Sequence, residues 1–346
     1  MRHHWMVGAA LAALSLFCHA QQYEIHDLGK AGGIGSIALD VNKKLMAVGI
    51  TGWDADGLWR PGLFSPYHAA AAIETPGPGT ATGINKKGEV VGDYSTFAGG
   101  FGFIWKNNRL ATMPSNGWRG ISPAAINDQS EIVGGGVLCC SGNASHAWKY
   151  SNGKLTDLGT WGGVSAFAVA INKQGDIAGN RIKYTVDGVQ VEEGIRIIDG
   201  QARALKGALP GSSVHLSSMN DRGDAAGYMY PSPGSNTTAF AFVNGKSKII
   251  GSGQYGSAQS INNKGQVVGA LQNPESFDAY AFLWKEGTLT NLNELPEVRA
   301  AGWIHLQRAA AISDEGVIVG LGFNAQNQGH AFMLVPRKNS GDRVDR

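Results

Sequence analysis

The sequence has little charge. Its 27 acidic and 29 basic residues make up 16% of 346, against roughly 25% in ordinary globular proteins. The net charge is only +2. Nucleic acid is thereby excluded as the main partner, because phosphate binding needs a clustered basic face. Hydrophobic residues still make up 43% of the chain, which excludes a disordered protein.

Long apolar runs are also scarce, and the one present lies at the amino terminus. A basic start at Met1–His4 precedes an apolar run from Trp5 to Phe17, which ends in Cys18-His19-Ala20. This pattern is typical of a secretory signal peptide, here residues 1–20 with cleavage after Ala20. The run is too short to span a bilayer, so we expect a secreted protein, extracellular or periplasmic, with no membrane span. A lipoprotein anchor on Cys18 is the alternative, although Phe17 is bulkier than such sites usually accept.

Recognisable catalytic motifs are absent. The sequence has no Gly-x-Ser-x-Gly, no His-Glu-x-x-His and no phosphate-cradling glycine loop. Asp54-Ala55-Asp56-Gly57 is half of a calcium loop without the remaining oxygen ligands. We therefore expect no cofactor and no metal site, and an enzyme is the less favoured class.

Glycine is abundant, at 50 residues, and much of it belongs to a sevenfold repeat. In each copy an apolar residue precedes asparagine, or serine in the last copy, and a glycine follows seven residues later. The pairs are Val41-Asn42, Ile84-Asn85, Ile126-Asn127, Ile171-Asn172, Met219-Asn220, Ile261-Asn262 and Ile312-Ser313. The glycines are Gly49, Gly92, Gly134, Gly179, Gly227, Gly269 and Gly320. Copies 42–51 residues apart match the blade length of a β-propeller.

Each copy can be interpreted as strands and turns. The apolar segment 166–171 suits a buried strand, Asn172-Lys173-Gln174-Gly175 suits a tight turn that ends in a left-handed residue, and 176–179 returns as a second strand. The closing glycine predicts a bulge or a close backbone approach. Leu45 and Ser130 replace the turn glycine in two copies, so those turns are expected to be less regular.

A third and a fourth strand complete each copy. The third alternates large and small residues, as in 101–105, 146–150, 280–284 and 330–334. A polar turn and a short strand such as 155–158 follow. Four antiparallel strands per copy predict an all-β fold, a seven-bladed β-propeller. Residues 23–29 resemble a fourth strand that the seventh copy lacks, so the N-terminal strand is expected to complete the last blade and close the ring. The domain then covers 21–336, and 337–346 form a disordered polar tail.

The repeat resembles a known family. Ile-Asn-x-x-Gly-x-Val-Val-Gly stands at 84–92 and 261–269, His-Ala-Phe at 330–332, and Leu-Thr-Asp-Leu-Gly at 155–159. This signature is similar to the HAF-type extracellular repeat family of bacteria. The resemblance covers nearly the whole mature chain and implies export and repeats, without an established activity. Ser313 in place of asparagine and Arg196 at a small position of blade four depart from the pattern, and Arg196 predicts irregular packing there.

The two faces of such a propeller differ in sequence. Turns between strands one and two, and three and four, are short and stereotyped, and they define the turn face. The two-to-three loops and the connections between blades vary, and they define the loop face. Variable loops on a repetitive scaffold usually carry binding. We therefore expect the ligand at the loop face, around the mouth of the channel.

Several residues on the expected loop face are candidates for binding. Flat rings with a polar edge can stack on sugars or dock peptide side chains. Alternatively, these rings cap the hydrophobic layers between blades. The candidates in the connections between blades are Trp118, Arg119, Trp161, Tyr255 and Trp303.

Two histidines are candidates for chemistry. His215 and His305 precede the inner strands of blades five and seven, and near a carboxylate either could act as acid or base. A structural role is the alternative. Neighbouring Cys139 and Cys140 predict a strained vicinal disulfide that stiffens a rim loop, because their Cα atoms lie about 3.8 Å apart. Free thiols or a bridge to another chain remain open.

These observations favour an exported, non-catalytic binding module. It would be a monomer that holds an extracellular carbohydrate or protein through aromatic-rich loops. The alternative is an extracellular hydrolase or lyase with its site at the channel mouth, and a purely structural role in the cell envelope is a third possibility.

Overall fold

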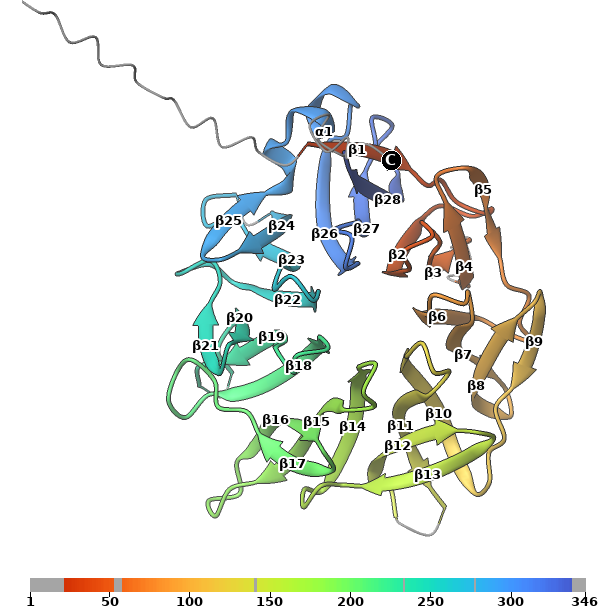
Figure 1. The fold of residues 1–346 in the computed structure, drawn as a ribbon, viewed down its shortest axis with the longest axis vertical. Helices are drawn as coiled ribbons and strands as arrows, with labels where there is room; N and C mark the ends of the chain where they lie inside the picture. Colours follow the sequence, from red (N-terminus) through yellow and green to blue (C-terminus); the bar gives the residue numbers. More distant parts are fainter. Residues whose placement is uncertain (1–21, 53–57, 140–141, 233, 277, 338–346) are drawn as a thin grey trace, which may run out of the picture.

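Seven four-stranded antiparallel sheets stand around a central axis as the blades of a β-propeller (Figure 1). The computed structural model describes residues 22–52, 58–139, 142–232, 234–276 and 278–337. Blades one to three, from the inner strand outward, are β2 (Ser36–Val41), β3 (Ala47–Thr51), β4 (Arg60–Ser65), β5 (His68–Ala72); β6 (Gly79–Ile84), β7 (Val90–Thr96), β8 (Gly99–Lys106), β9 (Arg109–Thr112); and β10 (Trp118–Ile126), β11 (Ile132–Leu138), β12 (Ser145–Ser151), β13 (Lys154–Gly159).

The remaining blades repeat this order. Blades four and five are β14 (Ser165–Ile171), β15 (Ile177–Tyr184), β16 (Gln190–Ile198), β17 (Gln201–Ala204); and β18 (Ser213–Met219), β19 (Ala225–Tyr230), β20 (Thr238–Val243), β21 (Lys246–Ile249). Blades six and seven are β22 (Gly256–Ile261), β23 (Val267–Gln272), β24 (Ala279–Lys285), β25 (Thr288–Asn291); and β26 (His305–Ile312), β27 (Ile318–Phe323), β28 (Gly329–Pro336) with β1 (Tyr23–Asp27) outermost. The sevenfold, four-stranded prediction is confirmed.

The only helices in the described part of the chain lie between blades six and seven. They are the 3-10 turn η1 (Leu292–Glu294) and the short helix α1 (Pro296–Ala300). Within the described ranges, no helix has both the length and the apolar character needed to cross a membrane.

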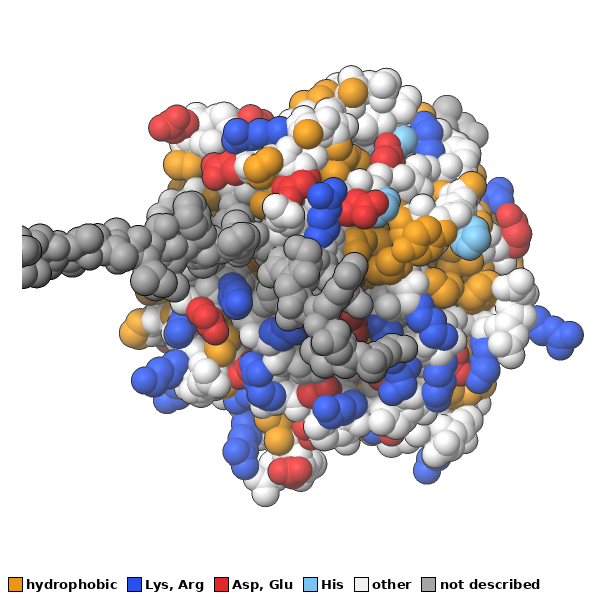
Figure 2. All heavy atoms as spheres, turned by 45° about the horizontal axis from the view of Figure 1, so that its top comes forward, with side chains coloured by type: hydrophobic (Ala, Val, Ile, Leu, Met, Phe, Trp, Pro, Cys, Tyr) orange, Lys and Arg blue, Asp and Glu red, His pale blue; other side chains and the backbone are white. Residues whose placement is uncertain are grey.

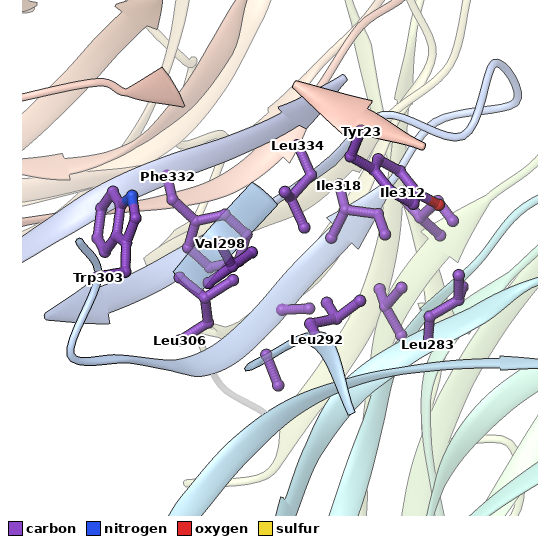
Figure 3. Close-up of a cluster of buried hydrophobic side chains, with 13 residues drawn as sticks. Tyr23, Leu283, Leu292, Val298, Trp303, Leu306, Ile312, Ile318, Phe332 and Leu334 are labelled. Atoms are coloured by element: carbon purple, nitrogen blue, oxygen red, sulfur yellow. The ribbon is translucent and has the colours of Figure 1, made fainter. Parts of the chain in front are cut away.

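The N-terminal strand closes the ring as predicted. β1 pairs antiparallel with β28, with Tyr23 opposite Pro336. Tyr23 is buried in a cluster with Leu283 of blade six and Phe332 of blade seven (Figure 3). Burial raises the pKa of Tyr23 to about 12. The residues predicted as signal peptide and as C-terminal tail fall outside the described residues, apart from Arg337.

A histidine–aspartate pair fastens the closing strand. Nδ1 of His330, in β28, lies 2.8 Å from Asp27 of β1. Blade three contains the same pair between His146 and Asp157, at 3.0 Å. The His-Ala and Asp-Leu-Gly segments of the repeat are therefore bonded to each other across the third and fourth strands.

The repeat glycines lie opposite a bulge in every inner strand. Each inner strand carries one extra residue at the same place, and the seven are Leu39, Thr82, Ala124, Val169, Ser217, Gln259 and Ala310. A Cβ on Gly227 would lie 1.9 Å from the carbonyl oxygen of His215, and one on Gly49 would lie 2.0 Å from that of Ile37. Only glycine fits there. The predictions of a bulge and of a close approach are both confirmed.

The turns at Leu45 and Ser130 are as regular as the others, so that expectation is wrong. Both residues take a left-handed conformation, with φ of 61° and 66°. Ser130 donates to the Asn127 carbonyl at 3.0 Å, as Gly88 does to Asn85. The turn is held by asparagine hydrogen bonds, and these offset the cost of a side chain at positive φ.

Arg196 does not disturb blade four, contrary to expectation. Its strand β16 pairs in continuous register with β15. The guanidinium lies 4.3 Å from the centre of the Phe242 ring and donates to the Gly223 carbonyl. The long side chain therefore reaches into blade five, where it is accommodated.

Candidate functional site

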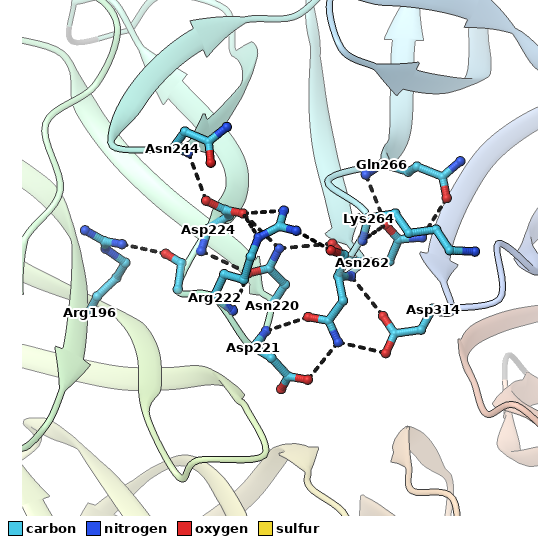
Figure 4. A network of polar contacts seen from close by, with 12 residues as sticks. Arg196, Asn220, Asp221, Arg222, Asp224, Asn244, Asn262, Lys264, Gln266 and Asp314 are labelled. Atoms are coloured by element: carbon cyan, nitrogen blue, oxygen red, sulfur yellow. Dashed lines mark hydrogen bonds and ion pairs between the residues drawn. The ribbon is translucent and has the colours of Figure 1, made fainter.

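The asparagines of the repeat form a polar belt around the turn-face mouth of the channel, and Figure 4 shows the part of it at Asn220 and Asn262. In blades one, two, three, five and six the side-chain amide donates to the main-chain carbonyl of the equivalent residue in the next blade, whereas the amide of Asn172 in blade four donates to Asp176 at 3.0 Å. The links are Asn42 to Asn85, Asn85 to Asn127 and Asn127 to Asn172 (3.1 Å each), Asn220 to Asn262 (3.0 Å) and Asn262 to Ser313 (2.9 Å). The belt joins neighbouring blades, so the repeated asparagine is a structural residue.

The charges at this mouth neutralise one another. A cavity of about 410 Å³ lies inside the belt. Around it Lys86 pairs with Asp128 at 3.0 Å, and Lys173 with Asp221 at 3.2 Å. Side chains already paired in this way offer little to a ligand. Figure 2 shows Lys and Arg side chains spread over the lower half of the molecule, with fewer Asp and Glu side chains among them.

Exposed apolar side chains are concentrated on the loop face. In the described residues, twelve large hydrophobic side chains are exposed, and eleven of them lie in or beside two-to-three loops or connections between blades. These eleven, which we call the loop-face apolar set, are Ile34, Leu58, Trp59, Phe97, Val164, Tyr184, Val186, Val189, Ile249, Tyr255 and Ile304. Exposed apolar groups gathered on one side of a molecule mark an interaction surface.

A cavity of about 590 Å³ lies at the loop-face end of the channel, and we call it the loop-face cavity. Its lining includes bulge residues of blades one to four and the inner strands of blade three. One side carries Asp93 of β7 and the other Phe167 of β14. Burial raises the pKa of the Asp93 carboxyl, and a hydrogen bond from Ser122 partly offsets this.

His215 belongs to an aromatic cluster beside this cavity. Its ring stacks on Tyr228 at 4.4 Å and lies 6.0 Å from Phe167. Nδ1 is 2.8 Å from Glu192 of β16. Burial, with a smaller contribution from nearby Tyr230, raises the pKa of Tyr228 well above its usual value. His215 is thus held by a carboxylate, which is the arrangement that an acid or base requires.

His305 lies in a different setting. Its ring stacks on Phe323 of the neighbouring strand, with centroids 4.9 Å apart. In the described part of the chain, no carboxylate lies within ion-pair distance of it. The two histidines that the sequence named as candidates therefore differ: His215 is hydrogen-bonded to a carboxylate, and His305, among the described residues, is not.

Two of the predicted binding aromatics are core residues. Trp118 is 7% exposed and packs in a cluster with Trp148, and Trp303 is 9% exposed and meets Phe332 edge-on at 6.2 Å. Their rings cap the layers between blades, so neither presents a face to a ligand, and the prediction that they bind one is corrected.

The remaining candidates differ in exposure. Trp161 is half-buried, and its ring covers Gly179, which fixes it against blade four. Arg119 is exposed at the start of β10. Tyr255 is 47% exposed and belongs to the loop-face apolar set. The sequence candidates thus lie around the rim and are not gathered in one concavity.

The predicted Cys139–Cys140 disulfide and the expectation of no metal site both stay predictions. Cys139 is exposed, with no disulfide to any residue that the structure describes. Cys140, like the half calcium loop at 54–57, lies outside the described residues, so the vicinal pair stays a prediction. In the described ranges, no three His, Cys, Asp or Glu side chains are grouped to hold a metal ion.

Sequence reasoning missed Asp93, Phe167 and Glu192. Asp93 follows the repeat glycine of its copy, where the others carry Ile50, Gly135, Asn180, Tyr228, Ala270 and Leu321. Superposing the seven copies would have shown one acid and one glycine at this position in adjacent blades. Glu192 lies near the start of β16, just after a two-to-three loop of variable length, and no repeat position marks it.

Comparison with known proteins identifies the fold class alone. No family model and no curated protein matches the chain. The β-propeller domain of the Trilobed protease from Pyrococcus furiosus is similar at 12% identity over 94% of this chain and 98% of that one, with a TM-score of 0.56. A puromycin-hydrolyzing peptidase of Mycobacterium tuberculosis is similar at 11% identity over 94% of this chain and 57% of that one, with a TM-score of 0.55. YCF48 bound to D1 peptide is similar at 8% identity over 93% of this chain and 97% of that one, with a TM-score of 0.51. The protein is a seven-bladed β-propeller.

Proposed function

We propose that the protein is an exported, non-catalytic binding module that holds a protein partner on its loop face. The observation that carries this is the concentration of eleven of the twelve exposed large hydrophobic side chains on that face. Aliphatic side chains form most of the set. They pack well against apolar protein surfaces, whereas sugar recognition relies on flat rings, and this favours a protein over a carbohydrate.

The densest part of the surface is the β15–β16 hairpin. Tyr184, Val186 and Val189 are exposed by 56%, 106% and 39%. The turn is closed by a hydrogen bond from Val189 to the Thr185 hydroxyl, at 3.1 Å. A closed hairpin presents these side chains at a low entropic cost of binding, so we expect it to be the centre of the interface.

Substitution on this hairpin tests the proposal. Wild-type protein immobilised by its C-terminus captures partners from surface extracts of the source cells, and the affinity of each captured protein is then measured with purified material. The combined change Val186→Ser and Val189→Ser is expected to weaken binding at least tenfold. Tyr67→Ser, an equally exposed apolar residue at the turn face, is the matched control. Equal affinity for the two variants, or glycan binding without any protein partner, would contradict the proposal.

A hydrolase or lyase is the second candidate, and one observation favours it. His215 is hydrogen-bonded to Glu192 at 2.8 Å beside the loop-face cavity. Degradation of an extracellular polymer that is abolished by both His215→Ala and Glu192→Gln, with unchanged melting temperatures, would replace the binding-module proposal. His305→Ala is the control, because that histidine lacks such a carboxylate in the described residues.

A further inference from the structure

The loop-face cavity exists because blade three has small residues where other blades have large ones. Gly135 stands where blades one, five and seven carry Ile50, Tyr228 and Leu321. A Cβ at Gly135 would lie 2.9 Å from Cβ of Phe167. Gly120, Gly136 and Ala124 line the same space. The hollow is thus specific to one blade of the ring.

This cavity contains a single ionisable side chain. Among the described residues that line it, Asp93 is the one acid, and none is lysine, arginine or histidine. The other polar side chains are occupied internally: Thr82 donates to the Pro123 carbonyl at 2.9 Å, and Ser145 donates to the Gly136 carbonyl at 3.4 Å.

Asp93 is half-buried, and in the part of the chain that the structure describes its carboxyl forms no ion pair. Ser122 donates to it, while burial disfavours its ionised form. A carboxylate withdrawn from water without a cation is costly, and a bound cation removes most of that cost. A neutral hydroxyl would add one ordinary hydrogen bond and leave the charge uncompensated.

The opposite wall is aromatic. Phe167 packs against Gly135. Gly135 is paired with Ser122 in the β10–β11 register, so Phe167 and Ser122 lie on either side of it. An aromatic face attracts a cation, and it does so more strongly when the cation is desolvated. The remaining wall is formed by Leu39, Val137 and Val169, which suit the methylene stem of a long side chain.

We propose that the loop-face cavity is a binding site for an ammonium group on an aliphatic stem, a lysine side chain of the protein partner, with Asp93 as its counter-ion and Phe167 as its aromatic wall. That the lysine belongs to a protein rests on the proposed function. The selectivity of the cavity for a cation is measured without any partner.

The experiment compares two matched probes by calorimetry on the full chain. Nα-acetyl-lysine methylamide carries the charge, and Nα-acetyl-norleucine methylamide has a similar stem without it. The lysine probe is expected to bind at least tenfold more tightly than the norleucine probe. Asp93→Asn is expected to abolish that preference, and Phe167→Leu to weaken lysine binding about threefold, as loss of a modest cation–π contact predicts.

Controls separate a lost site from a lost fold. Glu275→Gln removes an exposed carboxylate from the two-to-three loop of blade six, away from the cavity, and is expected to leave lysine-probe affinity unchanged. Asparagine is nearly isosteric with aspartate, so the Asp93→Asn melting temperature is expected to match or exceed that of wild type. Equal affinity for both probes, an undiminished preference in Asp93→Asn, or tighter binding of cellobiose than of the lysine probe would each overturn the proposal.

The result also distinguishes this site from the proposed function. If Val186→Ser with Val189→Ser leaves partner binding intact while the lysine probe still needs Asp93, the hairpin interface is wrong and the cavity assignment stands. If the hairpin variant loses the partner but both probes bind equally, the reverse holds.

Discussion

Replacing Ser313 by asparagine is expected to stabilise the protein. Ser313 occupies the asparagine position of blade seven, and its turn has the usual geometry, with Gly316 donating to its carbonyl at 2.9 Å. Its hydroxyl accepts one hydrogen bond, from Val317 at 3.3 Å. In the described residues, no side chain links this turn to Asn42 of blade one.

The gain follows from what asparagine does in other blades. Asn85 accepts from the main-chain N–H of Lys87 and of Glu89, both at 3.0 Å, and its amide donates to the next blade at 3.1 Å. Ser313→Asn would add the first and the last of these bonds. At about 1 kcal/mol net for each hydrogen bond, the expected gain is about 1–2 kcal/mol. For a domain of this size that raises the melting temperature by about 2–3 °C.

Thermal and denaturant unfolding measure the effect, and the reverse change is its control. Asn127→Ser would lose the link to Asn172 (3.1 Å) and the bond to Glu131 (2.8 Å), and is expected to cost about 2–3 kcal/mol. The reasoning is refuted if Ser313→Asn lowers the free energy of unfolding, or if Asn127→Ser leaves it unchanged.

Three further predictions concern the repeat and the closure. Gly227→Ala is expected to lower the free energy of unfolding by more than about 3 kcal/mol or to prevent folding, because its Cβ would overlap the His215 carbonyl. Gly153→Ala, at a φ of 79° in open space, is the control and is expected to cost about 1–2 kcal/mol. Comparable losses of the two variants in urea unfolding would refute the steric argument. Asp27→Asn is expected to destabilise the folded protein by about 1–2 kcal/mol and to speed hydrogen exchange in β1. Asp157→Asn removes the same pair in blade three and is expected to leave exchange in β1 unchanged. Equal protection of β1 in both variants would contradict this. Burial raises the pKa of Asp40 from 3.8 to about 6. The protonated carboxyl therefore contributes up to about 3 kcal/mol to the free energy of unfolding. This contribution is complete below about pH 4 and is lost as the pH rises through 6. Asp40→Ser, the residue at the equivalent Ser218 and Ser260, is expected to flatten the unfolding free energy between pH 4 and 8; an unchanged slope would count against it.

The fold could be predicted because its determinants are local and repeated seven times. A glycine opposite each bulge and an asparagine before each turn are enforced by backbone geometry, as the 1.9 Å approach at Gly227 illustrates. The strand near Tyr23 could be assigned because Asp27-Leu28-Gly29 matches the fourth strand of blade three. Such features depend on contacts within a blade or with its neighbour.

The candidate site could be predicted only in part, because its determinants are not local. The sequence placed ligand binding at the loop face, where the exposed apolar side chains do lie. It could not tell Trp303, buried in the core, from Tyr255, exposed on the rim, because both are aromatics in connections between blades. Nor could it pair Asp93 with Phe167, since they come from blades two and four and only the folded structure places both in the lining of one cavity.

The pairing of β1 with β28 has a consequence for biosynthesis. Asp27 leaves the ribosome 303 residues before its partner His330. Six blades can form as their own strands emerge, but the nascent chain must keep Tyr23–Asp27 unpaired until β28 has been made. A truncated product would thus retain an open sheet edge at each end of an incomplete circle, where another chain could add.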